Sequence, residues 1–199
     1  MDNRISTIFI GNLKLGDNIC FNVESTQSLY KNLNVNQPIN IKPIVIINAS
    51  ITEALMIDFV RRVKIHTKEF TYLDEKIRSQ VRNLKSDKEK FDFKTSINKF
   101  RHYNLLGAPN NFYECLQFLR EIRNKVHIQS TFYRTNENEA WTKDVLTISE
   151  LCVEYTLRYL SLNYPRPLKE DFVGGLSIAW NPHFSENSNI VWKNVKIPS

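Results

Sequence analysis

The stretch from Asn111 to Gln129 constrains the fold of this chain more than any other. Its apolar residues recur at helical spacing, with each residue advancing about 100° around the helix axis, and they form one wide stripe. The members of the stripe are Phe112, Cys115, Leu116, Phe118, Leu119, Ile122 and Val126. A helix with such a face has to bury it against other elements, so the pattern predicts a helix packed in a larger core.

Four polar residues border this stripe. With Arg120 as the reference, Asn124 lies about 40° to one side, and His127 and Arg123 lie about 20° and 60° to the other. The four side chains therefore share one face of the helix. Because that face lies between the apolar stripe and solvent, we expect it to be half buried.

Four further segments show helical periodicity, and they make the chain mainly α. The first is nearly apolar all round, which is typical of a helix surrounded by protein, and its Pro43 suits a first turn. Glu53 and Asp58 lie on this segment, and we expect them to pair with neighbouring arginines because carboxylates are rarely buried alone. The segments are Pro43 to His66, Thr71 to Lys85, Asp92 to Leu106 and Lys143 to Asn163.

Both ends of the chain have the composition of strands. Ser6 to Gly11 and Asn18 to Val23 are short and rich in β-branched and aromatic residues, and a turn at Leu15 to Asp17 would join them in a β-hairpin. Gly175 to Trp180 and Ile190 to Ile197 have the same character. They predict either a second hairpin or pairing with the N-terminal one, which gives an α+β arrangement overall.

Length and composition favour one domain with appendages. The 199 residues, 42% of them hydrophobic, suffice for one sizeable core and fall short of two typical domains. We expect a β-like flank over residues 1–42, a helical domain over 43–163, and a β-like tail over 164–199 that packs on the same domain.

Several classes of protein and site are not expected. No apolar run reaches roughly 18 residues and the N-terminus lacks a signal-peptide pattern, so we expect a cytoplasmic protein with no membrane partner. Cys20, Cys115 and Cys152 are odd in number and far apart. They suit reduced core thiols, so we expect neither a disulfide nor a metal site, and no cofactor.

The charge is compatible with a nucleic-acid partner without requiring one. Lys and Arg total 27 against 21 Asp and Glu, which gives a net charge of +6 and a pI near 9.2. Such an excess favours a polyanion through counterion release, but many basic proteins bind no nucleic acid.

The sequence LREIRNKVHI at 119–128, together with the order of the helices, resembles the HEPN superfamily over about Pro43 to Asn163. Members of that superfamily carry an arginine and a histidine separated by four to six residues, often with a polar residue after the arginine. Arg120 and His127 have six residues between them and meet this spacing. Arg123 and Asn124 match the arginine–polar pair, but only three residues separate Arg123 from His127. Both arginines therefore remain candidates for the family's role.

The resemblance implies an antiparallel helical bundle that forms a homodimer with the site at its interface. It also implies a metal-independent endoribonuclease that leaves a 2′,3′-cyclic phosphate. His127 would be the general base or acid, Arg120 and Arg123 would hold the phosphate, and Asn124 would orient it. Ribonucleases of this superfamily often serve as toxins or antiviral effectors, which makes an antitoxin protein an expected partner. The basic residues expected to guide RNA are Lys125, Arg134 and Lys143.

Two other functions fit the same residues. A non-catalytic RNA-binding module would use the basic helix, with Tyr133 and Trp141 as exposed aromatic residues for base stacking. A structural dimerisation module would use the polar face as an interface. In that case the cluster would interact with the C-terminal end of the helix and bridge to Glu121 or Glu53 without any catalysis.

Overall fold

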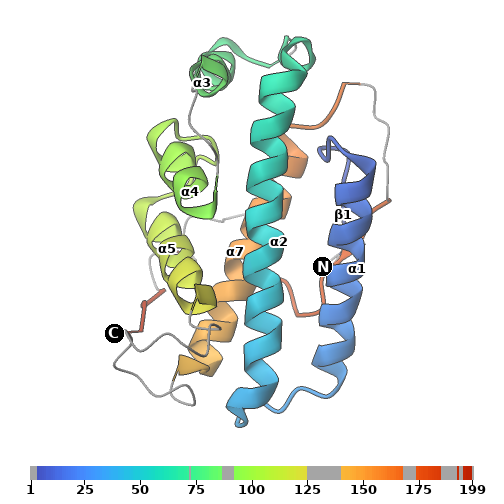
Figure 1. The fold of residues 1–199 in the computed structure, drawn as a ribbon, viewed down its shortest axis with the longest axis vertical. Helices are drawn as coiled ribbons and strands as arrows, with labels where there is room; N and C mark the ends of the chain where they lie inside the picture. Colours follow the sequence, from blue (N-terminus) through green and yellow to red (C-terminus); the bar gives the residue numbers. More distant parts are fainter. Residues whose placement is uncertain are drawn as a thin grey trace.

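The computed structural model describes residues 4–71, 73–86, 92–124, 140–167, 174–184, 192 and 195–198. Within these residues the chain is mostly helical, with one small antiparallel sheet of two strands (Figure 1). The elements in chain order are β1 (Arg4–Ile5), α1 (Leu13–Lys31), α2 (Pro38–Ile65), the 3-10 helix η1 (Thr67–Phe70), α3 (Glu75–Ser86), α4 (Phe93–His102), α5 (Asn110–Asn124), α7 (Lys143–Asn163) and β2 (Leu176–Ser177).

Helix α2 lies at the centre of the bundle and contacts α1, α3, α4, α5 and α7 (Figure 1). The prediction of a helix surrounded by protein is confirmed for the wide face that packs inward, where Ile41, Ile44, Val45, Leu55 and Met56 are all at most 1% exposed. The opposite face is only partly covered, since Ile46, Ile47 and Ala54 are half buried and Arg61 is exposed. By length and composition alone α2 could cross a membrane, but 61% of its most apolar window is buried inside the protein. The apolar residues of α2 form the core around which the other helices pack.

The start of α2 differs from the prediction. Pro38 occupies the first turn and Pro43 lies inside the helix. A proline fits the first turn because the N–H that it lacks has no partner there in any case. Pro43 removes one backbone hydrogen bond further along, and the helix continues because the residues on both sides of it, Ile41 and Ile44, are fully buried.

Helix α7 has the predicted bounds, Lys143–Asn163. Thr142 caps it, with its hydroxyl oxygen accepting a hydrogen bond from the Val145 N–H at 3.3 Å. Asp92 caps α4 in the same way, at 2.7 Å from the Thr95 N–H. The apolar spacing located the start of both helices and the end of α7, whereas α4 ends at His102, four residues before the predicted end at Leu106.

The predicted N-terminal hairpin is wrong, because Leu13–Lys31 is a single helix. Asn12 caps it by accepting from the Leu15 N–H at 3.0 Å, and Ile19 and Val23 lie buried one turn apart. β-Branched residues disfavour helix only weakly, and burying this pair in the core outweighs that preference.

The strands that do form join the two ends of the chain. Arg4 and Ile5 of β1 pair antiparallel with Ser177 and Leu176 of β2. The two ends therefore pair, as one of the alternatives predicted, but through Arg4–Ile5 and not through the expected strands Ser6–Gly11 and Asn18–Val23, and the described residues at either end form no hairpin. Within the stretch 190–197, the described residues 192 and 195–197 are not in a strand.

Two glutamates on α7 hold the segment that follows β2. Glu154 is fully buried and accepts hydrogen bonds from the Trp180 indole at 3.2 Å, the His183 N–H at 2.9 Å and the Arg158 Nε at 2.8 Å. Glu150 lies one turn earlier, with Oε2 2.6 Å from the His183 ring Nε2. A buried carboxylate requires such partners, so this network fixes the C-terminal segment on α7.

Arg62 near the end of α2 joins three segments of the backbone. Its side chain is 1% exposed, and its guanidinium donates to the carbonyls of Phe9 at 2.9 Å, Tyr164 at 2.6 Å and Pro165 at 3.0 Å. Its Nε lies 2.8 Å from a carboxylate oxygen of Glu69. The guanidinium therefore links α2 to the N-terminal segment, to η1 and to the end of α7.

Candidate functional site

The apolar stripe of α5 is buried as the sequence predicts. Its residues face α2, α4 and α7, which all contact α5. Phe112, Cys115, Leu116, Leu119 and Ile122 are at most 3% exposed, and Phe118 is half buried. Val126 lies outside the described residues.

Contacts at the start of α5 hold it in place. The Asn111 side-chain amide donates to the Trp192 carbonyl at 2.6 Å. The Phe112 ring packs edge-on against the Trp192 ring, with 5.0 Å between the ring centroids. The Tyr113 hydroxyl donates to the Phe100 carbonyl at 3.1 Å. The polar face near the other end of α5 therefore lies on a helix that is fixed at its beginning.

Cys115 of α5 and Cys152 of α7 are both buried, as expected for core thiols. Burial, followed by the nearby charge of Glu114, raises the pKa of Cys115 to about 12. Burial also raises the pKa of the Cys152 thiol. Both thiols stay protonated at neutral pH, which makes them poor nucleophiles and assigns them to packing.

Arg123 on the polar face of α5 pairs with Glu53 of α2. Arg123 Nη1 and Glu53 Oε2 are 2.5 Å apart, although 70 positions separate the residues in sequence. The side chains are 33% and 20% exposed, so the pair is partly buried and remains accessible to solvent. An arginine has five N–H donors. Within the described part of the chain, Glu53 is the one partner of this guanidinium.

Arg120 lies one turn earlier on the same edge of α5. Its Nε donates to the Gln117 side-chain oxygen at 3.0 Å, and its Nη2 lies 3.3 Å from Glu121 Oε1. The side chain is 22% exposed. Glu121 and Glu53 are the two carboxylates that the sequence named as possible partners of this cluster, and both pairings are present.

The other predicted site residues divide into two groups. Asn124 and Lys143 are exposed, at the last described position of α5 and the first position of α7. Those two positions lie toward the same end of the bundle (Figure 1). The residues His127, Lys125, Arg134 and Tyr133 lie outside the described residues.

Trp141 is not available for base stacking, contrary to the prediction. It is 2% exposed, and the Lys42 ammonium lies 5.7 Å from the centre of its ring. The prediction failed because an aromatic residue next to a polar loop is usually expected to be exposed. In the structure this ring is part of the buried core.

Sequence analysis did not identify a second group of basic side chains, which lies on α3. Arg78, Arg82 and Lys85 line a cavity beside this helix. Their spacing of four and three residues places them on one face of a helix, and this was the signal that could have identified them.

The charged residues described here offer phosphate contacts more readily than metal ligands. Within the described ranges, no group of three or more His, Cys, Asp and Glu side chains could hold a metal ion. Arg120 and Arg123 could hold an anion, because guanidinium groups match the geometry of phosphate oxygens.

Comparison with known proteins identifies no relative of this chain: no family model, no curated protein and no solved structure matches it.

Proposed function

We propose that this protein is a metal-independent endoribonuclease of HEPN type that acts in the cytoplasm as a homodimer, with its site at the dimer interface. One observation carries the proposal. Arg123 is oriented by Glu53 at a half-buried edge of α5, with Arg120 and Asn124 beside it and the sequence position of His127 four residues after Arg123.

Glu53 acts as a positioning residue in this proposal. A guanidinium that binds a carboxylate through one nitrogen keeps further N–H donors in a fixed plane, and these can bind a phosphate oxygen. Holding the side chain in place before RNA arrives reduces the entropy lost when the phosphate binds.

The reaction is attack of a ribose 2′-oxygen on the adjacent phosphorus. A base takes the 2′-hydroxyl proton, the new O2′–P bond forms, the P–O5′ bond breaks, and the 5′-oxygen receives a proton. His127 suits the proton transfer because its unperturbed pKa lies near neutral pH. Arg120 and Arg123 stabilise the charge that grows on the phosphate, and Asn124 donates a hydrogen bond to it.

A toxin or antiviral effector in partnership with an antitoxin protein is the role that we propose for such an activity. Lys143 would help to guide RNA toward α5, because it is exposed at the end of the bundle where α5 ends. Expression of the wild-type chain should then arrest growth, and His127→Ala should abolish the arrest. Arrest that persisted in the variant would contradict this role.

Cleavage of a small RNA in EDTA tests the proposal directly. We expect wild-type protein to produce 2′,3′-cyclic phosphate ends, and we expect His127→Ala, Arg120→Ala and Arg123→Ala each to lower the rate at least about 100-fold. Lys76→Ala changes one exposed charge on α3 and serves as the matched control, with an unchanged rate. Cleavage that survives His127→Ala would contradict the assignment of the base.

A second candidate is a non-catalytic RNA-binding or structural dimerisation module. The observation that favours it is that both arginines already have carboxylate partners, Glu121 and Glu53. The same assay separates the candidates. RNA binding without cleavage would identify the binding module, and a dimer that neither binds nor cleaves RNA would identify the structural one.

A further inference from the structure

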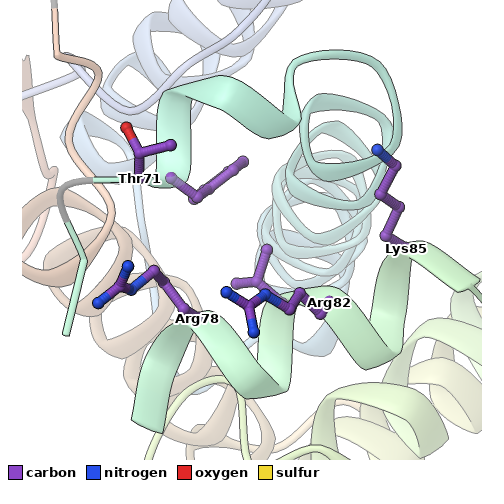
Figure 2. A pocket seen from close by; sticks show the side chains of 6 residues that line it. Thr71, Arg78, Arg82 and Lys85 are labelled. Atoms are coloured by element: carbon purple, nitrogen blue, oxygen red, sulfur yellow. The ribbon is translucent and has the colours of Figure 1, made fainter. Parts of the chain in front are cut away.

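A cavity of about 280 Å³ lies beside α3, facing the end of η1 (Figure 2). Helix α3 lies at the end of the bundle where α2 terminates, whereas α5 lies beside an earlier part of α2 (Figure 1), where Arg123 pairs with Glu53. The lining residues of the cavity are Phe70, Thr71, Arg78, Val81, Arg82 and Lys85. No step of the proposed ribonuclease reaction uses any of them.

The cavity combines an apolar floor with a basic rim. Phe70 and Val81 are each 3% exposed and belong to the core, so only a small apolar edge of each reaches the cavity. Arg78, Arg82 and Lys85 extend from one side of α3, with Thr71 on the opposite side of the cavity (Figure 2). An amphipathic anion with a flat apolar part would match both surfaces.

The rim has more positive than negative charge. Glu75 is the carboxylate paired with its arginines, at 3.1 Å from Arg78 and 3.4 Å from Arg82. Glu75 is 67% exposed, and an ion pair so open to solvent is weak. A ligand phosphate could therefore replace Glu75 as the partner of either guanidinium.

Arg78 supplies a second sign of a ligand site. Its Nε is buried and has no hydrogen-bond partner within the described part of the chain. Burying an N–H donor without a partner costs free energy, which an acceptor oxygen on a ligand would recover.

We propose that this cavity binds a nucleoside monophosphate. The phosphate contacts Arg78, Arg82 and Lys85, and the base lies at the mouth of the cavity against the small apolar edges that Phe70 and Val81 present. The Thr71 hydroxyl, which donates to the Lys68 carbonyl at 3.0 Å, accepts a hydrogen bond from the ribose. Guanidinium groups match phosphate oxygens in a bidentate arrangement. The volume is close to the lower bound of about 300 Å³ for small-molecule pockets, which suits one nucleotide and excludes a folded polymer.

Titration calorimetry on the full-length protein tests this site, with AMP, GMP, CMP and UMP as probes. At least one nucleotide should bind, with an affinity at least 10-fold above those of its nucleoside and of inorganic phosphate alone. Arg78→Gln combined with Arg82→Gln should weaken that binding at least 10-fold. Lys76→Gln, which removes one charge from α3 outside the cavity lining, should leave the affinity unchanged.

Arg82→Gln combined with Lys85→Gln offers a second test at two exposed positions, and circular dichroism should show that its fold is intact. Absence of binding by all four nucleotides would overturn the proposal, as would binding that survives either double variant. Inorganic phosphate that binds as tightly as the nucleotides would also overturn it, by identifying a simple anion site. His127→Ala should bind the nucleotide as the wild type does, so failure of this site and failure of the ribonuclease proposal give different results.

Discussion

Helix α2 contributes one residue to each of two arginine–glutamate pairs, Arg62–Glu69 and Arg123–Glu53. The two pairs differ in what surrounds the guanidinium. Arg62 is 1% exposed and has three backbone carbonyls as partners besides Glu69. Arg123 is 33% exposed and pairs with Glu53 alone among the described residues. The comparison shows that an ion pair by itself does not indicate a role. A guanidinium whose three nitrogens are all engaged, as in Arg62, stabilises the fold, and one with free donors at the surface can also bind a ligand.

The largest effect is expected at Arg62. Arg62→Met should lower the free energy of unfolding by about 3–5 kcal/mol, because it leaves Glu69 and the carbonyls of Phe9, Tyr164 and Pro165 without their donor. Urea unfolding followed by circular dichroism measures this loss. Arg61→Met, the exposed neighbour on the same helix, should change stability by less than about 0.5 kcal/mol. A loss below about 1 kcal/mol for Arg62→Met would remove the distinction between the two pairs.

Glu69→Gln sharpens the comparison from the carboxylate side. Glu69 contacts Arg62 at 2.8 Å and Arg166 at 3.9 Å, and its side chain is 19% exposed. We expect a smaller loss of about 1–2 kcal/mol, since Arg62 keeps its three carbonyl acceptors and glutamine retains one oxygen. Urea unfolding measures it. A loss as large as that of Arg62→Met would show that the carboxylate, more than the carbonyls, holds the guanidinium.

The pair at α5 should matter little for stability and much for function. Arg123→Met should lower the free energy of unfolding by about 1 kcal/mol or less, because the pair is half exposed. RNA cleavage should nevertheless fall at least about 100-fold. Glu53→Gln should reduce cleavage less than Arg123→Met does, since Glu53 positions the arginine without touching the phosphate.

Unfolding and single-turnover cleavage, measured on the same variants, separate the two effects. A loss of several kcal/mol for Arg123→Met with no change in cleavage per folded molecule would place this pair with Arg62, among the contacts that stabilise the fold.

The sequence predicts the helices that have a clear stripe and cap. Lys143–Asn163 was located to the residue, because its apolar residues recur at helical spacing along the whole segment. Leu13–Lys31 was missed, because short β-branched and aromatic runs around Gly16 suggest strands, whereas packing against α2 and the Asn12 cap favour the helix. Local preference is a weak guide wherever burial in the tertiary fold decides the conformation.

Only the part of the candidate site that lies on one helix could be predicted from the sequence. The shared edge of Arg120 and Arg123 follows from helical geometry. Sequence could offer Glu53 only as one of several partners, since contact between residues 70 positions apart depends on how α5 packs against α2. Nothing local to Trp141 indicates its burial, which likewise arises from packing.

The smallest effect on stability is expected at Asp58, near Arg62. Here the test is the direction in which the free energy of unfolding changes with pH. Its side chain accepts a hydrogen bond from the Gly11 N–H at 3.0 Å, and the residue is 4% exposed. Burial raises the pKa of this carboxyl above its ordinary value, although the Gly11 N–H and the charges of Arg62, Arg61 and Arg166 act to lower it. The folded protein therefore binds a proton at Asp58 more readily than the unfolded chain does.

This raised pKa sets the direction in which stability changes with pH. As pH falls through the folded-state pKa toward the ordinary value of about 4, protonation of Asp58 should add to the free energy of unfolding. Asp58→Asn keeps an acceptor for the Gly11 N–H and lacks this proton, so it serves as the matched reference. Urea unfolding of both proteins from pH 7 to pH 4 should show the free energy of unfolding of the wild type increasing relative to that of Asp58→Asn.

A shift in the opposite direction would mean that the attraction between Asp58 and Arg62 exceeds the cost of burying the Asp58 carboxylate. Asp58 would then be a second carboxylate that stabilises the protein through Arg62, and the guanidinium that links α2 to its neighbours would depend on two acids instead of one.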